Sequence, residues 1–152
     1  MRRALRLHLR EIGDLGLVPE HVLADRAGDD RWVALKGDGT RLPIDRIHDA
    51  ASLVGLGPSV LDRQLDALEH PHEGVRYWGV VGLRSQDISS GAVVGAASRM
   101  LEDPSVSVRT EAAGLCLQAG VRPERAERVL IEAIGGDSSH AALYAAREGQ
   151  LA

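Results

Sequence analysis

The stretch HPHEGVRYWGVVGL, residues 70–83, decides the fold, because its pattern returns thirty-three residues later. Residues 101–116 read LEDPSVSVRTEAAGLC, and Asp103 stands there in the place of His70. The other matched positions are Pro71 with Pro104, Val75 with Val108, and Arg76 with Arg109. Self-similarity at this period, in units of helix, short turn and helix, is typical of a stack of helix pairs.

Amphipathic patterns around the two copies predict further helices. After Pro123, the segment ERAERVLIEAI has its apolar residues at Ala126, Val129, Leu130, Ala133 and Ile134, a spacing that gives one helix face. Two upstream segments, PIDRIHDAASLV and PSVLDRQLDAL, also begin with a proline in the expected first turn. The sequence therefore predicts an all-α chain, a short α-solenoid of antiparallel helix pairs.

The organisation along the chain is uneven. Residues 1–42 contain two Gly-rich turns between short helical candidates, and we expect an irregular helical segment that acts as a linker or end cap. Residues 43–152 form the predicted repeat domain, with units at about 57–86, 87–120 and 121–152. The last unit lacks the Val-Arg pair, as expected of a terminal unit that has no successor to pack against.

Composition and charge exclude several classes of function. The 152 residues include no Phe, only 2 Trp and 2 Tyr, and carry a formal charge of −4, with a pI near 5.8. This balance argues against a nucleic-acid binder, whose affinity comes from clustered Lys and Arg. Arg2, Arg3, Arg6 and Arg10 form a basic start that fits a solvated helix face better than a phosphate track. No stretch is apolar enough to predict a membrane span or a secretory leader.

The residues with metal or nucleophilic chemistry are few. His70-Pro71-His72 offers two imidazoles in one turn, without further ligands at a recognisable spacing, so we expect no metal and no other cofactor. Cys116 is the single cysteine, which excludes an internal disulfide. It lies on the apolar side of its predicted helix, and we expect a buried, unreactive thiol.

The repeat residues have a mechanical interpretation. Asp103 can accept N–H groups of the following helix, Pro104 fits the first turn of that helix, and Val108 points inward. Arg109 can reach acidic groups or carbonyls of an adjoining unit. Because the arginines recur with the period, we interpret them as structural rather than as an anion site.

Tyr77 and Trp78 are the candidate interface. Thr110 and Glu111 occupy the matching positions one period later, and their polarity predicts that these positions face solvent. The two aromatic side chains would then either be covered by residues 1–42, through Trp32 or Leu23, or form a surface for a protein partner. The sequence leaves both alternatives open.

The turns with Asp-Pro and Val-Arg resemble those of HEAT repeats, the armadillo-like helical arrays. Nearly the whole chain resembles the helical tail that follows the catalytic domain in some bacterial sulfatases. Three segments carry this resemblance. LREIGDLGLVPEHVL resembles the linker after that domain, LPIDRIHDAASLVGLG resembles the first long helix, and GVRYWGVVGL with SVRTEAAGL resembles the repeats. The resembled family is often exported, whereas this chain shows no leader and would be cytoplasmic by default.

The catalytic residues of a sulfatase are missing from the sequence. The formylglycine nucleophile needs a cysteine or serine with a proline two residues on and an arginine two after that. Cys116 begins CLQAG, and no serine has a proline at that position. We therefore expect a non-catalytic module that docks on or stabilises a protein partner, a sulfatase-type catalytic domain or another protein. The alternatives are a fragment of a sulfatase-family hydrolase and an enzyme on a helical-repeat scaffold, of glycosylase or lyase type.

Overall fold

The computed structural model describes residues 8, 12, 14–20, 22–23, 42–136 and 145–146. In this part of the chain the regular elements are helices, and no strand is present. They are α3 (Ile44–Ala51), the 3-10 helix η2 (Pro58–Val60), α4 (Leu61–Ala67), α5 (Glu73–Leu83), α6 (Gly91–Met100), α7 (Val106–Gln118) and α8 (Pro123–Ile134). The described chain is all-α, as predicted. Most of residues 1–42, with Trp32, and most of the second helix expected in the last unit lie outside it.

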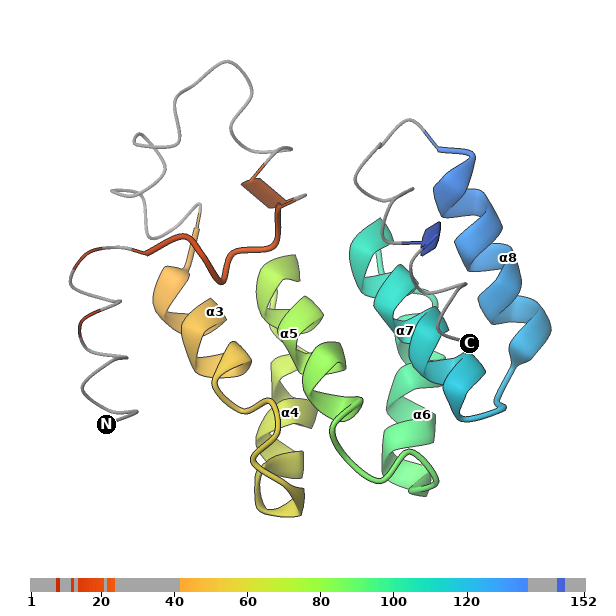
Figure 1. The fold of residues 1–152 in the computed structure, drawn as a ribbon, viewed down its shortest axis with the longest axis horizontal. Helices are drawn as coiled ribbons and strands as arrows, with labels where there is room; N and C mark the ends of the chain where they lie inside the picture. The colour runs from red at the N-terminus through yellow and green to blue at the C-terminus, as the bar shows by residue number, and fades with distance from the viewer. Residues whose placement is uncertain are drawn as a thin grey trace.

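The helices form two rows. Figure 1 shows α3, α5 and α7 side by side, with α4 alongside α5 and α6 alongside α7. Helix α5 packs against α3, α4 and α7, and α7 packs against α6 and α8. Consecutive helices α4 with α5, and α6 with α7, are joined by short turns and run antiparallel (Figure 1). Each pair contacts its neighbours in sequence order along the stack.

The core is aliphatic, as expected for a chain without Phe. Most buried residues belong to one cluster that runs from α4 to α8, and its members include Leu68, Val80, Leu83, Leu101, Val108, Leu115 and Val129. Cys116 belongs to this cluster and is buried, as predicted. A second cluster joins α3 and the start of α5 to the N-terminal part of the chain through Val18, Val22, Leu23, Leu42, Ile47, Ala50 and Val75.

Two glycines set the close approach of α4 and α5. A Cβ atom on Gly79 would lie 2.7 Å from Leu68 Cδ2 and 3.2 Å from the Gln64 carbonyl oxygen. A Cβ atom on Gly82 would lie 2.8 Å from Gln64 Nε2. Gln64 is fully buried, and its amide donates to the Leu53 carbonyl and accepts from Gln86. At this contact α5 presents only backbone, at Gly79 and Gly82. Helix α4 presents Gln64, whose buried amide has hydrogen-bond partners.

Three helix details differ from the sequence predictions. Pro104 precedes the N-cap residue Ser105, because α7 begins at Val106, so it lies outside the first turn in which it was expected. Pro43, also expected in a first turn, is the N-cap residue of α3, which begins at Ile44. In α8, which begins at Pro123 as predicted, Ile134 is 52% exposed rather than inward-facing. Its neighbours Val129, Leu130 and Ala133 use the buried face.

Candidate interaction surface

The repeated arginines make the same contacts in the two copies. Arg76 Nη1 donates to the carbonyl oxygens of His70, at 3.0 Å, and Pro71, at 2.8 Å. Arg109 Nη1 donates to the carbonyl oxygens of Asp103, at 2.6 Å, and Pro104, at 3.0 Å. Each arginine thus fastens the turn that precedes its own helix. The prediction that Arg109 reaches an adjoining unit is wrong for these two bonds, since both carbonyls belong to its own turn.

Arg76 also connects one unit to the next. Its Nε and Nη2 donate to Asp103 Oδ2 and Oδ1 at 2.7 and 2.9 Å, and both side chains are nearly buried. Asp103 Oδ1 accepts in addition from the Ser105 N–H at 2.8 Å, so the carboxylate stabilises the turn before α7 and not, as predicted, the N–H groups of the helix itself. Planar guanidinium and carboxylate groups match in this bidentate geometry. One acid therefore fixes both the turn and the neighbouring helix.

Tyr77 belongs to a buried polar group between α5 and α7. Its hydroxyl donates to Glu111 Oε1 at 3.1 Å, while Arg84 Nη1 donates to Glu111 Oε2 at 3.0 Å. Glu111 is 1% exposed and Thr110 is fully buried, so the prediction that these positions face solvent is wrong. The physical reason is that each has a partner inside: Arg84 compensates the Glu111 charge, and the Thr110 hydroxyl donates to the Val106 carbonyl.

Trp78 contacts the N-terminal part of the chain. Its indole Nε1 donates to the Leu17 carbonyl oxygen at 2.6 Å, and its ring packs with the second cluster, which contains Leu23. A second bond of the same kind joins His48 Nε2 to the Asp14 carbonyl oxygen at 2.9 Å. The Tyr77 and Trp78 rings meet edge to face, with centroids 5.6 Å apart. The adjacent aromatics thus face two directions, one toward α7 and one toward residues 14–23.

This placement bears on the two alternatives for Tyr77 and Trp78. Tyr77 is 7% exposed, and Trp78 is half-buried against Leu17. The hydrogen bond to Leu17 is of the kind expected of an end cap, Leu23 belongs to the cluster against which Trp78 packs, and Trp32 lies outside the described residues. The part of the Trp78 side chain that stays exposed is the part that a protein partner could contact. Sequence reasoning missed Arg84 and His48, because neither has a counterpart of the same type one period later.

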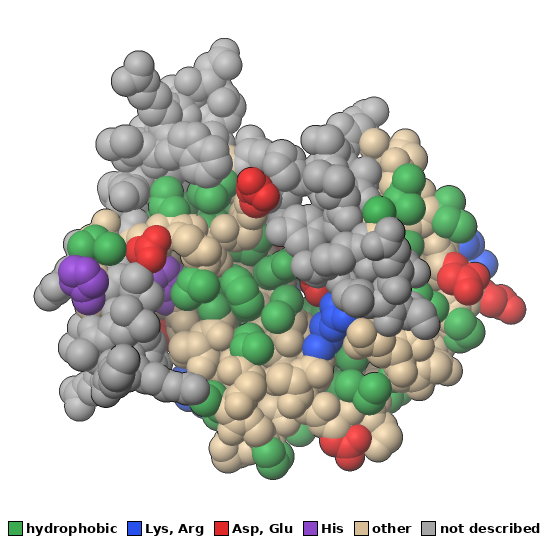
Figure 2. All heavy atoms as spheres, viewed as in Figure 1, with side chains coloured by type: hydrophobic (Ala, Val, Ile, Leu, Met, Phe, Trp, Pro, Cys, Tyr) green, Lys and Arg blue, Asp and Glu red, His purple; other side chains and the backbone are tan. Residues whose placement is uncertain are grey.

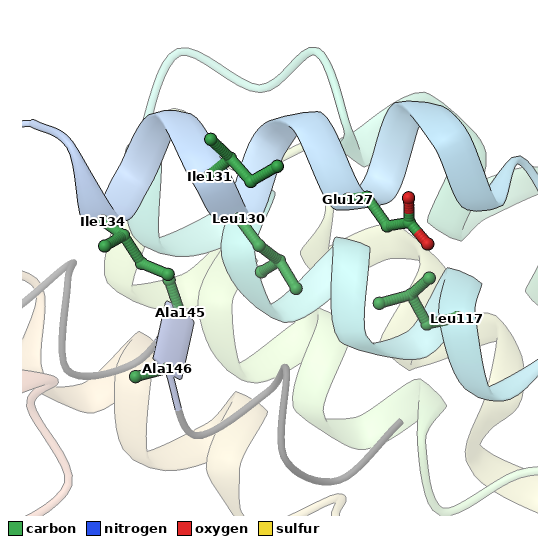
Figure 3. A pocket seen from close by; sticks show the side chains of 7 residues that line it. All are labelled: Leu117, Glu127, Leu130, Ile131, Ile134, Ala145 and Ala146. Atoms are coloured by element: carbon green, nitrogen blue, oxygen red, sulfur yellow. The ribbon is translucent and has the colours of Figure 1, made fainter.

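A groove lies at the other end of the stack, along α8 (Figure 3). It has a volume of about 490 Å³ and is bounded by Leu117, Leu130, Ile131, Ile134 and the Ala145–Ala146 segment. In Figure 3, Leu130 and Leu117 project into the space between α8 and α7, and Ile134 extends toward Ala145. Ile131 is 69% exposed. Ile134, three positions further on, is 52% exposed, so two large apolar side chains of α8 are accessible beside the groove.

The face shown in Figure 2 carries hydrophobic side chains gathered over its middle, with few charged groups among them. Among the described residues, no group of three or more His, Cys, Asp and Glu side chains is arranged to hold a metal ion. None of the described helices has the length and hydropathy of a membrane span. Comparisons with protein-family models, with curated proteins and with solved structures gave no match to this chain.

Proposed function

We propose that the chain is a non-catalytic HEAT-like repeat module, a short α-solenoid that docks on a protein partner or stabilises it. The observation that carries this proposal is the repetition of one contact set: Arg76 and Arg109, one period apart, bind the same two carbonyls of the preceding turn. Repeated turns with repeated helix pairs are how solenoids extend a surface for protein contacts.

The α8 groove supplies the docking surface in this proposal. Among the described helices, the main packing contact of α8 is with α7, and the other face of α8 is the one offered to a protein partner in this proposal. Ile131 and Ile134 give that face an apolar centre, and Glu127 lies at its edge. A sulfatase-type catalytic domain, joined to this module or encoded beside it, is the partner that the sequence resemblance suggests. Because this chain lacks the nucleophile motif, any sulfatase reaction would take place on that partner.

The first experiment measures turnover of arylsulfate and sulfated-glycan substrates by the full chain in the presence of calcium. We expect no turnover above that of a denatured sample, and clear turnover would refute the non-catalytic assignment.

The second experiment asks whether the α8 groove is the docking surface. The full chain and its Ile131→Glu, Ile134→Glu double variant are cross-linked in the source cells, with Leu56→Glu as the matched control because Leu56 is also exposed, at 40%. We expect one partner to be captured by the wild-type chain and by Leu56→Glu, and to be lost from the groove variant. Equal capture by all three proteins would place docking elsewhere.

A further inference from the structure

A second cleft, of about 240 Å³, lies between α3 and α4 and is closed by the turn before α5. Aliphatic side chains of the three helices form its floor, and its polar lining consists of Arg46, Asp49, Arg63, Asp66 and His70. A water molecule occupies about 30 Å³ in the liquid, so the cleft accommodates a molecule of several heavy atoms. An apolar floor with a few convergent polar groups is the usual composition of a small-molecule site.

The two helices bring matching side chains to this cleft. Helix α3 reads IDRIHDAA and the segment from Leu61 reads LDRQLDAL, so both follow the pattern apolar, Asp, Arg, two residues, Asp, Ala. An arginine and an aspartate three positions apart lie on the same face of a helix. Each helix therefore contributes one guanidinium group and one carboxylate to the lining of the cleft.

Three of the charged side chains have no partner in the part of the chain that the structure describes. Within residues 42–136 and the other described positions, no hydrogen bond or ion pair engages the side chains of Arg46, Arg63 or Asp66. The other arginines discussed above differ in this respect. Arg76 and Arg84 form ion pairs with acids, and Arg109 donates to carbonyls. Arg46, Arg63 and Asp66 are exposed, so the cleft offers a ligand from solution charged groups of both signs.

His70 adds a neutral donor at one end. Its Nδ1 accepts from the His72 N–H at 3.0 Å, which leaves the ring proton of the neutral imidazole on Nε2. Burial lowers the pKa of His70, and the nearby Arg46 and Arg76 guanidinium groups lower it further against the hydrogen bond with His72. At neutral pH the ring is therefore uncharged and available as an N–H donor.

We propose that this cleft binds a small zwitterionic ligand, one that carries a phosphate or carboxylate group and an ammonium group. Arg46, Arg63 and His70 receive the oxyanion, and the Asp66 carboxylate receives the ammonium group. A ligand with both charges compensates Arg46, Arg63 and Asp66 together, whereas a simple anion would face the Asp66 carboxylate with like charge. The site is separate from the α8 groove and does not depend on the docking role.

The experiment titrates the full chain with phosphoethanolamine, with γ-aminobutyrate and with inorganic phosphate, and follows the His70 ring resonances by NMR. We expect one of the two zwitterions to bind about tenfold more tightly than inorganic phosphate, a difference of about 1.4 kcal/mol. The tighter zwitterion identifies the oxyanion as phosphate or carboxylate. If inorganic phosphate binds as tightly as both zwitterions, or if no probe moves the His70 resonances, the proposal is wrong.

Variants assign the roles within the cleft. Arg63→Gln and Arg46→Gln each remove an exposed guanidinium group, and each is expected to weaken zwitterion binding about tenfold or more. Asp66→Asn is expected to abolish the advantage of the zwitterion over inorganic phosphate. Arg128→Gln, an exposed arginine of α8, is the matched control and should leave binding unchanged. Equal weakening by Arg128→Gln would show general charge attraction and overturn the site.

Discussion

Arg76 holds Asp103 with two parallel hydrogen bonds of 2.7 and 2.9 Å, and the Asp103 side chain is 3% exposed. The pair joins a helix of one unit to the turn of the next. A partner removed from such a pair leaves a charge buried without compensation, which costs about 3 to 5 kcal/mol. An exposed pair, by contrast, contributes about 0.2 to 1 kcal/mol.

Asp103→Asn should therefore destabilise the protein strongly. We expect a loss on the order of 3 kcal/mol in the free energy of unfolding, measured by urea denaturation. Glu69→Gln is the matched control, because the Glu69–Arg99 pair has side chains that are 73% and 60% exposed. Its loss should stay below about 1 kcal/mol. Similar losses for the two variants would contradict a structural role for the Arg76–Asp103 pair.

Trp78→Phe and Tyr77→Phe should show separately what the contact with Leu17 and the contact with Glu111 stabilise. Trp78→Phe removes the donor to the Leu17 carbonyl, so amide hydrogen exchange should accelerate around residues 14–18. Tyr77→Phe removes the bond to Glu111, so it should lower stability by about 1 to 3 kcal/mol without a selective effect on those residues. Unchanged exchange at residues 14–18 in Trp78→Phe would remove the support for the end cap.

The double change Tyr77→Thr, Trp78→Glu makes the first copy resemble the second. It tests whether the two aromatic side chains are covered by an end cap or contact a protein partner. The contacts with Glu111 and Leu17 lead us to expect lower stability and early proteolysis of the N-terminal part of the chain. Loss of partner association with unchanged melting would instead favour the interface alternative.

Two glycine substitutions should change stability in opposite directions. A Cβ atom on Gly79 would overlap Leu68, and Gly79→Ala should cost about 1 to 3 kcal/mol through overpacking. A Cβ atom on Gly95 would meet nothing within 4 Å, and Gly95→Ala should stabilise α6 by about 0.5 to 1 kcal/mol. Thermal melting of both variants checks the sign.

The lowered pKa of His70 predicts a pH dependence of stability. The unfolded chain, in which His70 has its ordinary pKa of 6.5, takes up a proton more readily than the folded chain. The contribution of His70 to stability is therefore complete above pH 6.5 and is lost as the pH falls below it. His70→Asn keeps an acceptor for the His72 N–H without titrating, and should flatten the pH profile of the unfolding free energy.

Cys116 should be unreactive in the folded protein. Burial raises the pKa of its thiol, and the thiolate is the form that reacts. Iodoacetamide is expected to label Cys116 only after denaturation, as followed by mass spectrometry. Rapid labelling of the native protein at neutral pH would show that α7 opens locally.

The sequence predicted the repeated elements well because they follow local rules. The period located Arg76 and Arg109, and proline with apolar spacing located α8. The sequence-based prediction failed at Thr110 and Glu111, because the burial of a polar residue depends on partners from other helices. Arg84 and Tyr77 lie 27 and 34 positions from Glu111, and no pattern within either helix reveals them. The free charges of the α3–α4 cleft were missed for the same reason.

The two buried ion pairs have a mechanical consequence for the whole stack. Arg76 and Arg84 bind Asp103 and Glu111 at opposite ends of α5, each across 27 positions, so α5 cannot slide along α7 without breaking both pairs. Two fixed points on α5 define its position along the axis of α7, so a force applied along α5 would be transmitted to α7 instead of being taken up by sliding between the two helices.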